Sequence, residues 1–252
     1  MKLLRYLHTF YAVLIFGIFA LFAIPIYFIG FGLFGQKAAS TVMGYNRFWV
    51  RTWGFLTGIR YRSVNEEYVD SEKAYVYIAN HRAIADIFVV AAVVPGVFHP
   101  LMKAEGGKYP IMGYLFKQFC VMVDRKSMES RQRSLLQLKE RVKRGNSILV
   151  FPEGTRNRSN EILLNPFYAG AFRIAIDLQI PVVPITFLGT RDVFPNNHFL
   201  IHPATITCVF GKPIETKGLQ SKDTERLKKE SFEVIEGVLL ENRGVLSKPS
   251  SF

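Results

Sequence analysis

A histidine and an aspartate five positions apart, His81 and Asp86, are the side chains of this sequence best suited to acid–base chemistry. If His81 lies in a loop and Asp86 in the first turn of the next helix, the carboxylate accepts a hydrogen bond from one imidazole nitrogen and fixes the tautomer. The other nitrogen is then free to take a proton from an attacking hydroxyl. The same spacing also fits a histidine that caps a helix or lies satisfied in a core.

The segment 151–156 (FPEGTR) is the second candidate for chemistry. A proline directly after a buried strand, followed by glycine and threonine, predicts a tight loop whose backbone N–H groups point at an anion. Arg156 adds a planar fork that suits phosphate, and Glu153 is placed to orient this arginine or to bind a ligand hydroxyl. The alternative is an ordinary exit from a strand with one surface ion pair.

Two further cations, Lys103 and Arg125, stand beside expected strand ends or loops. Each of them taken alone is more often a solvated surface charge than a ligand. Asp124 precedes Arg125 and is placed to pair with it or to position it.

From about residue 60 onward, strand and helix patterns alternate, which predicts an α/β sheet with helices packed on it. We expect strands over residues 74–79, 119–123, 147–151, 181–187 and 205–210, and helices over about 85–93, 128–144, 169–178 and 224–240. Polar clusters at 80–81, 124–125 and 152–156 each follow one of the first three strands. If these strands are parallel, the clusters meet at one edge of the sheet, where open α/β sheets bind ligands.

The N-terminal part of the chain is almost purely apolar over residues 10–34. This stretch is longer than the apolar part of a secretory signal, about 7–15 residues, and it reaches the length of about 20 residues that spans hydrocarbon. Pro25, with Gly30 and Gly32 beyond it, predicts that the helix is kinked or broken.

The next stretch, residues 42–56, carries Tyr45, Trp49 and Trp53 at helical spacing, with Arg47 and Arg51 on a different face. This mixture suits an amphipathic helix lying at the level of lipid headgroups. The alternative is a helix that packs against the core of the following domain. Together the two N-terminal segments predict a hydrophobic hairpin anchor.

The composition narrows the class of protein. The chain has 252 residues, of which 49% are hydrophobic and 14% aromatic, so a packed core is expected and wholesale disorder is excluded. Its formal net charge of +12 favours anionic partners such as nucleic acid, an anionic membrane face or phosphorylated substrates. No nucleic-acid-binding module is recognisable, and the positive charge is spread along the chain. Cys120 and Cys208 stand in apolar surroundings and are expected to be buried, reduced thiols.

Four segments resemble, in order, the four motifs of the 1-acylglycerol-3-phosphate acyltransferases of the bacterial PlsC type. They are 80–86 (NHRAIAD, the HX4D pattern), 101–105 (LMKAE) with Pro110, Gly113 and 123–125 (VDR), then 151–156 (FPEGTR), and 183–185 (VPI). Together they make the resemblance strong, although no single motif would be. One departure is Tyr168, which stands where the family commonly carries a lysine, so that one possible phosphate contact is lost.

This resemblance implies a glycerol-phosphate acyltransferase-like fold, with a mixed, largely parallel sheet flanked by helices. It implies that His81 is the general base and that Asp86 orients it. Pro184 would shape the side of the acyl donor. The phosphate or glycerol region of the acceptor would be bound by a set of residues from three motifs: Lys103, Arg125, Glu153, Gly154, Thr155 and Arg156.

The implied reaction moves a fatty acyl chain from a thioester, on CoA or on acyl carrier protein, to the sn-2 hydroxyl of lysophosphatidic acid. No metal and no further cofactor is expected. The alternatives are the same reaction on a lyso-aminolipid or another lysophospholipid, CoA-independent transacylation, and a membrane lipid-binding protein without catalysis. The intact pair of His81 and Asp86 argues against the last of these.

The chain is therefore expected to have three parts: membrane-anchoring hydrophobic and amphipathic helices over residues 1–58, an acyltransferase α/β domain over 59–242, and a flexible tail over 243–252. We expect the domain to lie on the cytoplasmic face, against an anionic membrane surface.

Overall fold

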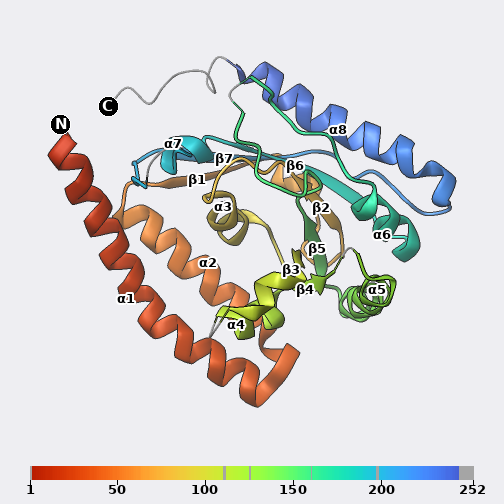
Figure 1. Cartoon of the computed structure of the whole chain (residues 1–252), viewed down its shortest axis with the longest axis horizontal. Coiled ribbons are helices and arrows are strands. Elements are labelled where there is room, and N and C mark those ends of the chain that lie inside the picture. Colours follow the sequence, from red (N-terminus) through yellow and green to blue (C-terminus); the bar gives the residue numbers. More distant parts are fainter. Residues whose placement is uncertain (1, 110–111, 125, 160, 197–198, 244–252) are drawn as a thin grey trace.

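The computed structural model describes residues 2–109, 112–124, 126–159, 161–196 and 199–243 (Figure 1). In this part of the chain, seven strands form one sheet in the order β1-β7-β6-β2-β5-β3-β4. Every neighbouring pair of strands is parallel except β6 and β7. The predicted mixed, largely parallel sheet is thus confirmed. The strands are β1 (Arg60–Val64), β2 (Val76–Ala79), β3 (Phe98–Lys103), β4 (Val121–Val123), β5 (Ser147–Val150), β6 (Val182–Leu188) and β7 (Thr205–Phe210).

Helices cover both faces of this sheet (Figure 1). The first three helices lie on one face, and α5, α6 and α8 lie on the other. The described helices are α1 (Lys2–Phe34), α2 (Ala39–Leu56), α3 (Asp86–Val93), α4 (Met112–Phe119), α5 (Met128–Lys143), α6 (Gly170–Leu178), α7 (Thr190–Val193) and α8 (Thr224–Glu241), with short 3-10 turns at Gly35–Ala38, Glu66–Tyr68, Ala104–Lys108 and Ser221–Asp223.

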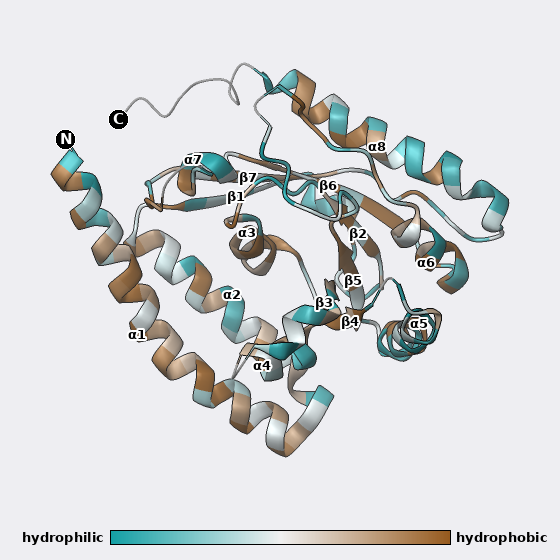
Figure 2. Ribbon diagram, in the orientation of Figure 1, coloured by the Kyte–Doolittle hydropathy of each residue, from teal (hydrophilic) through white to brown (hydrophobic). Residues whose placement is uncertain are grey.

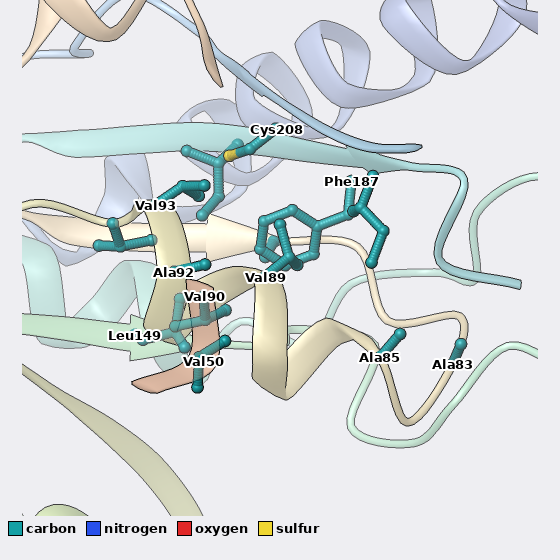
Figure 3. Close-up of a cluster of buried hydrophobic side chains, with 14 of the residues drawn as sticks. Val50, Ala83, Ala85, Val89, Val90, Ala92, Val93, Leu149, Phe187 and Cys208 are labelled. Atoms are coloured by element: carbon teal, nitrogen blue, oxygen red, sulfur yellow. The ribbon is translucent and has the colours of Figure 1, made fainter. Parts of the chain in front are cut away.

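The central strands β2, β5 and β6 are buried along their whole length and are mostly apolar, as expected for strands covered on both faces. In β2, Tyr77 points into the core shared with α2 and α3, whereas Ile78 points into the core shared with α5, α6 and α8. Figure 3 shows side chains of α3, such as Val89, beside Phe187 of β6 in the first of these cores. The helix that follows β2 is therefore seated directly on the sheet.

Most of the predicted elements are confirmed, but four were missed, among them the four-residue helix α7. Strand β1 was missed because its arginines face outward at the edge of the sheet, so it carries little apolar pattern. Strand β3 contains His99 and Pro100, which do not suggest a strand, and α4 is only eight residues long. The expected tail at 243–252 lies, apart from residue 243, outside the described residues.

The two N-terminal helices form an antiparallel hairpin, as expected (Figure 1). Helix α1 runs through Pro25 as one helix, so a break at this position is excluded, whereas the kink expected there stays a prediction. The chain reverses instead at Gly35, whose φ of 54° is the left-handed conformation that glycine adopts without strain.

Helix α2 packs against the core, and does not lie on its surface. Trp49 and Trp53 are only 8% and 1% exposed, which favours the core-packing alternative over a helix whose tryptophans lie among lipid headgroups. The arginines of α2 also face the protein, because Arg47 donates to the carbonyl of Val94 and Arg51 Nε donates to that of Ala92 at 2.8 Å. These two carbonyls belong to the C-terminal end of α3, where cations stabilise a helix.

The tip of the hairpin is tied to the sheet through a buried histidine. His99 is fully buried, and its Nδ1–H donates to the carbonyl of Phe119 at 2.8 Å. Burial, together with the charge of Arg141, lowers the pKa of His99 to about 4, so this imidazole is neutral near pH 7. Arg141 also donates to the side chain of Gln36 in the hairpin turn. The hairpin and the α/β domain therefore share polar contacts as well as apolar ones.

Candidate active site

The loop after β2 is closed by the carboxylate of Asp86. His81 Nδ1 lies 2.7 Å from Asp86 Oδ2, and the same oxygen accepts the backbone N–H groups of Arg82 at 2.7 Å and Ala83 at 3.0 Å. Asp86 is completely buried, whereas the side chain of His81 keeps 20% of its exposure. Because a carboxylate only accepts, Nδ1 carries the proton of the neutral imidazole and Nε2 presents a lone pair.

Neighbouring residues hold the imidazole of His81 in place. The amide of Asn80 bonds twice to Phe187 of β6, accepting its N–H at 2.7 Å and donating to its carbonyl at 3.0 Å. The ring of His81 stacks on that of Phe151, with centroids 4.3 Å apart. The end of β2 and the ring plane of the histidine are thus fixed by two adjacent strands.

Glu153 is buried behind this loop and serves as its second support. Its Oε1 accepts the backbone N–H of His81 at 2.6 Å, and its Oε2 accepts that of Asn165 at 2.9 Å. Burial raises the pKa of Glu153, and the two backbone N–H groups oppose that shift. Both carboxylate oxygens accept hydrogen bonds from backbone N–H groups. Glu153 therefore orients the His81 loop and does not orient Arg156. Its direct contact with an acceptor stays a prediction.

The remaining residues of the 151–156 segment are more open. Gly154 adopts a φ of 69°, and its N–H donates to the carbonyl of Phe151 at 3.1 Å, which makes the turn tight. Gly154 and Thr155 are exposed, and Arg156 is half-buried. No hydrogen bond or ion pair joins Arg156 to another of the described residues. No described group therefore occupies the guanidinium, and its binding of an anion stays a prediction.

The other predicted site residues lie at different distances from His81. Lys103 ends β3 at the same edge of the sheet, two strands and thus about 10 Å from the end of β2. It pairs with Glu105 at 3.0 Å. Arg125 lies outside the described residues. Pro184 is buried inside β6, opposite Ile78, so its effect on an acyl donor stays a prediction.

The parallel strands bring the predicted clusters to one edge. Strands β2, β5, β3 and β4 are neighbours and run in the same direction, so their carboxyl ends carry His81, Glu153, Lys103 and Asp124 along a single edge. The convergence expected from the sequence is confirmed for these described residues. Such an edge is where open α/β sheets bind their ligands.

Sequence reasoning missed two residues that support the site. The buried Asn157 donates its backbone N–H to the carbonyl of His81 at 2.7 Å. Arg191, at the carboxyl end of β6, donates to the backbone carbonyls of Asn157 and Ser159. Asn157 directly follows the 151–156 segment, which is a weak signal. Arg191 has no signal at all, because only the fold brings it to this loop.

The described geometry can perform general base catalysis. A histidine with one nitrogen held by a buried carboxylate and the other at the surface can deprotonate a bound hydroxyl. Within the described ranges, no three side chains of the histidine, cysteine, aspartate or glutamate type gather closely enough to hold a metal ion. Whether the chemistry is free of metal stays a prediction.

Comparisons with known proteins point in one direction. Residues 60–188 match the family model described as Acyltransferase. A 1-acyl-sn-glycerol-3-phosphate acyltransferase of Cocos nucifera is 32% identical over 143 residues, which are 56% of this chain and 46% of that protein. The 1-acyl-sn-glycerol-3-phosphate acyltransferase beta of Homo sapiens is 26% identical over 182 residues, which are 71% of this chain and 64% of that protein. The chain thus spans between about half and two thirds of the length of these curated relatives.

The fold is similar to a solved structure over nearly its whole length. The crystal structure of the 1-acyl-sn-glycerophosphate (LPA) acyltransferase PlsC from Thermotoga maritima superposes with a TM-score of 0.78. The match covers 99% of both chains at 21% sequence identity. At this identity the likeness concerns the fold, including the N-terminal hairpin.

Glu153→Ala is expected to loosen the loop that carries His81. The change removes two hydrogen bonds to half-buried backbone N–H groups, which together contribute about 1–3 kcal/mol, so local opening becomes about tenfold to a hundredfold more frequent. Hydrogen–deuterium exchange should show faster exchange in the peptides that contain His81 and Asn165. The exposed Glu161, changed to alanine, is the matched control on the same loop. Unchanged exchange in the Glu153 variant would contradict the supporting role.

Proposed function

This chain belongs to the acyltransferase family, and we propose that it transfers a fatty acyl chain from an acyl thioester to the sn-2 hydroxyl of lysophosphatidic acid, which gives phosphatidic acid. The observation that carries the proposal is the pair of His81 and Asp86, with Nδ1 held at 2.7 Å and Nε2 left at the surface. Relatives that bear the name of this activity support the choice of acceptor.

In the proposed reaction, His81 Nε2 takes the proton of the lysolipid hydroxyl as its oxygen attacks the thioester carbonyl carbon. The carbon–oxygen bond forms, and the tetrahedral intermediate then collapses with cleavage of the carbon–sulfur bond. The leaving thiolate takes the proton back from the imidazolium. Asp86 stabilises the imidazolium through the hydrogen bond to Nδ1 and remains ionised throughout. No covalent enzyme intermediate is required.

The headgroup of the acceptor is proposed to bind at Arg156. Its guanidinium has no partner among the described residues and follows β5, the strand adjacent to the one that ends before His81. A planar guanidinium binds phosphate through two parallel hydrogen bonds. Gly154, Thr155 and Lys103 would complete the site from the same edge of the sheet, and Arg125 stays a predicted member of it.

A second acceptor class is favoured by Tyr168. This residue stands where the family commonly has a lysine, and it is 64% exposed close to the 151–156 segment, with its N–H donating to the carbonyl of Pro152 at 2.9 Å. With one cation fewer, the site would also suit a lyso-aminolipid or another lysophospholipid. The donor would be acyl-CoA or acyl carrier protein in either case.

A lipid-binding protein without catalysis fits the structure less well. Burying a carboxylate such as Asp86 is costly, and the fold supplies three donors to one of its oxygens in order to keep it beside His81. A protein that only binds lipid has no use for this arrangement.

The outer face of the hairpin is proposed to insert into a membrane. In the described part of the chain, Lys2–Leu56 is the helical stretch that is long and apolar enough to cross a bilayer. Large apolar side chains stand exposed along it, for example Leu33 at 73% and Phe55 at 83%, and Figure 2 shows the apolar residues along α1. Soluble monomers rarely expose an apolar surface of this extent.

The packing of α1 favours insertion into one leaflet over a full span. Its inward side contacts the protein along its length. The ring nitrogens of His8 lie 2.9 Å from the carbonyl oxygen of Ile201 and 3.0 Å from that of Thr57, and the ring of Phe31 packs on that of Phe119. A helix held lengthwise against a domain lies along the bilayer surface. The α/β domain would then lie against the anionic cytoplasmic face.

His81→Ala is expected to lower kcat/KM for acyl transfer by about 10²–10⁴-fold, because it removes the general base. Acyl transfer from a radiolabelled acyl-CoA to lysophosphatidic acid, measured with the purified full-length protein, tests this. Sedimentation with vesicles should show that membrane attachment is unchanged. Turnover close to that of the unmodified protein would refute the assignment of the base.

Arg156→Ala is expected to raise KM for lysophosphatidic acid by about tenfold to a hundredfold, because a charge-assisted hydrogen bond contributes about 1.5–3 kcal/mol. KM for acyl-CoA should change little. An acceptor panel with an uncharged lysolipid and an amino-acid lysolipid then shows whether the loss follows the phosphate. Arg158→Ala is the matched control, since Arg158 is exposed two residues further on. Equal losses in both variants would trace the effect to overall charge.

Leu33→Asp combined with Phe55→Asp is expected to reduce binding to anionic vesicles by about tenfold or more, because burial of each side chain contributes about 1.5–3 kcal/mol. Flotation of the protein with vesicles measures the bound fraction. Leu136→Asp serves as the control, because Leu136 is an apolar side chain on α5 that is 66% exposed. Vesicle binding that drops only in the control would place the membrane surface elsewhere.

A further inference from the structure

The catalytic pair proposed above has buried polar atoms that its own hydrogen bonds leave unused. Asp86 Oδ2 accepts three hydrogen bonds, but Asp86 Oδ1 is buried and has no hydrogen-bond partner among the described residues. Arg82 is only 5% exposed, and its Nε and Nη1 also lack partners within the described part of the chain. A buried polar group without a partner costs about 1–3 kcal/mol, so three of them at one site call for an explanation.

The electrostatic environment of Arg82 shows which charged groups lie near its guanidinium. Burial lowers the pKa of Arg82, and the negative charges of Glu153 and Asp86 oppose this shift, so the guanidinium lies within electrostatic reach of both carboxylates. Arg191 lies close enough that the charge of Arg82, after burial, helps to lower its pKa to about 10. Two buried carboxylates and two guanidiniums therefore stand together behind the His81 loop.

Arg191 and Arg82 differ in the hydrogen bonds that their guanidinium groups make. Arg191 donates to the backbone carbonyls of Asn157 and Ser159, so its guanidinium supports the loop after the 151–156 segment. The Nε and Nη1 donors of Arg82 make no comparable contact. Among the described residues, Asp86 Oδ1 is an acceptor without a donor, whereas Arg82 Nε and Nη1 are donors without an acceptor. The two groups are therefore complementary in both charge and hydrogen bonding.

The backbone holds Arg82 where such a contact is possible. Its N–H donates to Asp86 Oδ2 at 2.7 Å, and its carbonyl accepts from Asn196 Nδ2 at 3.2 Å. The residue is thus fixed from both sides, and burial removes the solvent that would otherwise compete for the guanidinium. Holding the long side chain of Arg82 in one buried position costs conformational entropy. A purely apolar side chain at this position would lose less conformational entropy.

We propose that Arg82 is a positioning residue of the active site, whose guanidinium donates to Asp86 Oδ1 through one enclosed water molecule and so keeps the carboxylate aligned with His81. A water molecule accepts from the guanidinium and donates to Oδ1, which satisfies all of these groups at once. Arg82 acts through Asp86 and does not touch the substrate. The inference rests on the proposed function only for its catalytic consequence.

The coupling of Arg82 with Asp86 is tested first without any activity measurement. A double-mutant cycle compares the midpoints of thermal unfolding of Arg82→Met, Asp86→Asn and the double variant, all as full-length protein in detergent. Each single change leaves the other group buried and unpaired, so the double variant should lose less in Tm than the sum of the two single losses. Strictly additive losses would overturn the proposal.

The consequence for catalysis is tested with Arg82→Ala, Arg82→Lys and, as a matched control, Arg173→Ala on the exposed side of α6. Arg82→Ala should lower kcat by about tenfold to a hundredfold, less than the loss of the base itself, with KM for lysophosphatidic acid and acyl-CoA nearly unchanged. Arg82→Lys should recover part of kcat because it restores the charge. Low millimolar guanidinium chloride, but not urea, should also raise kcat of Arg82→Ala.

The outcomes separate the two proposals. An unmodified protein that acylates none of the lysolipids contradicts the proposed function, while the unfolding cycle still decides the coupling of Arg82 with Asp86. An active protein in which Arg82→Ala has normal kcat, or raises KM for the lysolipid alone, overturns the positioning role. Equal kcat of the alanine and lysine variants, together with no effect of guanidinium, would assign Arg82 to structure only.

Discussion

One buried oxygen atom, Asp86 Oδ2, accepts hydrogen bonds from the imidazole of His81 and from two backbone N–H groups of the intervening loop. His81 and Asp86 are five positions apart and still meet, because the loop folds back over the first turn of α3. The alternative of a histidine that merely caps a helix does not fit, since here the aspartate is the buried acceptor and His81 reaches the surface. Glu153 and Asn157, which bond to the backbone of His81, hold this loop in place.

The supports come from strands that are far apart in sequence and adjacent in the sheet. In the segment that follows β5, Glu153 accepts the N–H of His81, and the ring of Phe151 stacks on that of His81. On the other side, Phe187 of β6 is bonded twice to Asn80. Buried carboxylates are unfavourable unless they are hydrogen-bonded and balanced by cations. Arg82 and Arg191 are cations within electrostatic reach of Asp86 and Glu153 behind the loop, so the geometry of the His81 loop and its local stability depend on the same group of charges.

The N-terminal hairpin takes part in this arrangement and is more than a detachable anchor. Its inner side carries Arg47 and Arg51 to the C-terminal carbonyls of α3, the helix that begins with Asp86, while Phe16 packs edge-on against Phe88 of that helix. Its outer side is the exposed apolar surface assigned to the membrane. The segment proposed to bind lipid therefore also packs against α3, the helix that begins with Asp86.

The sequence by itself determined the local features: the apolar hairpin, the buried central strands, and the motifs that end them. These follow from apolar periodicity and turn chemistry, which neighbouring residues dictate. The tertiary structure alone decided that Trp49 and Trp53 face the core, that Glu153 supports the His81 loop, and that Arg191 reaches Asn157. Such contacts depend on strand order and on the direction of each side chain. A polar residue in a sequence has the same type whether it faces ligand, solvent or a backbone N–H, and only packing selects among these.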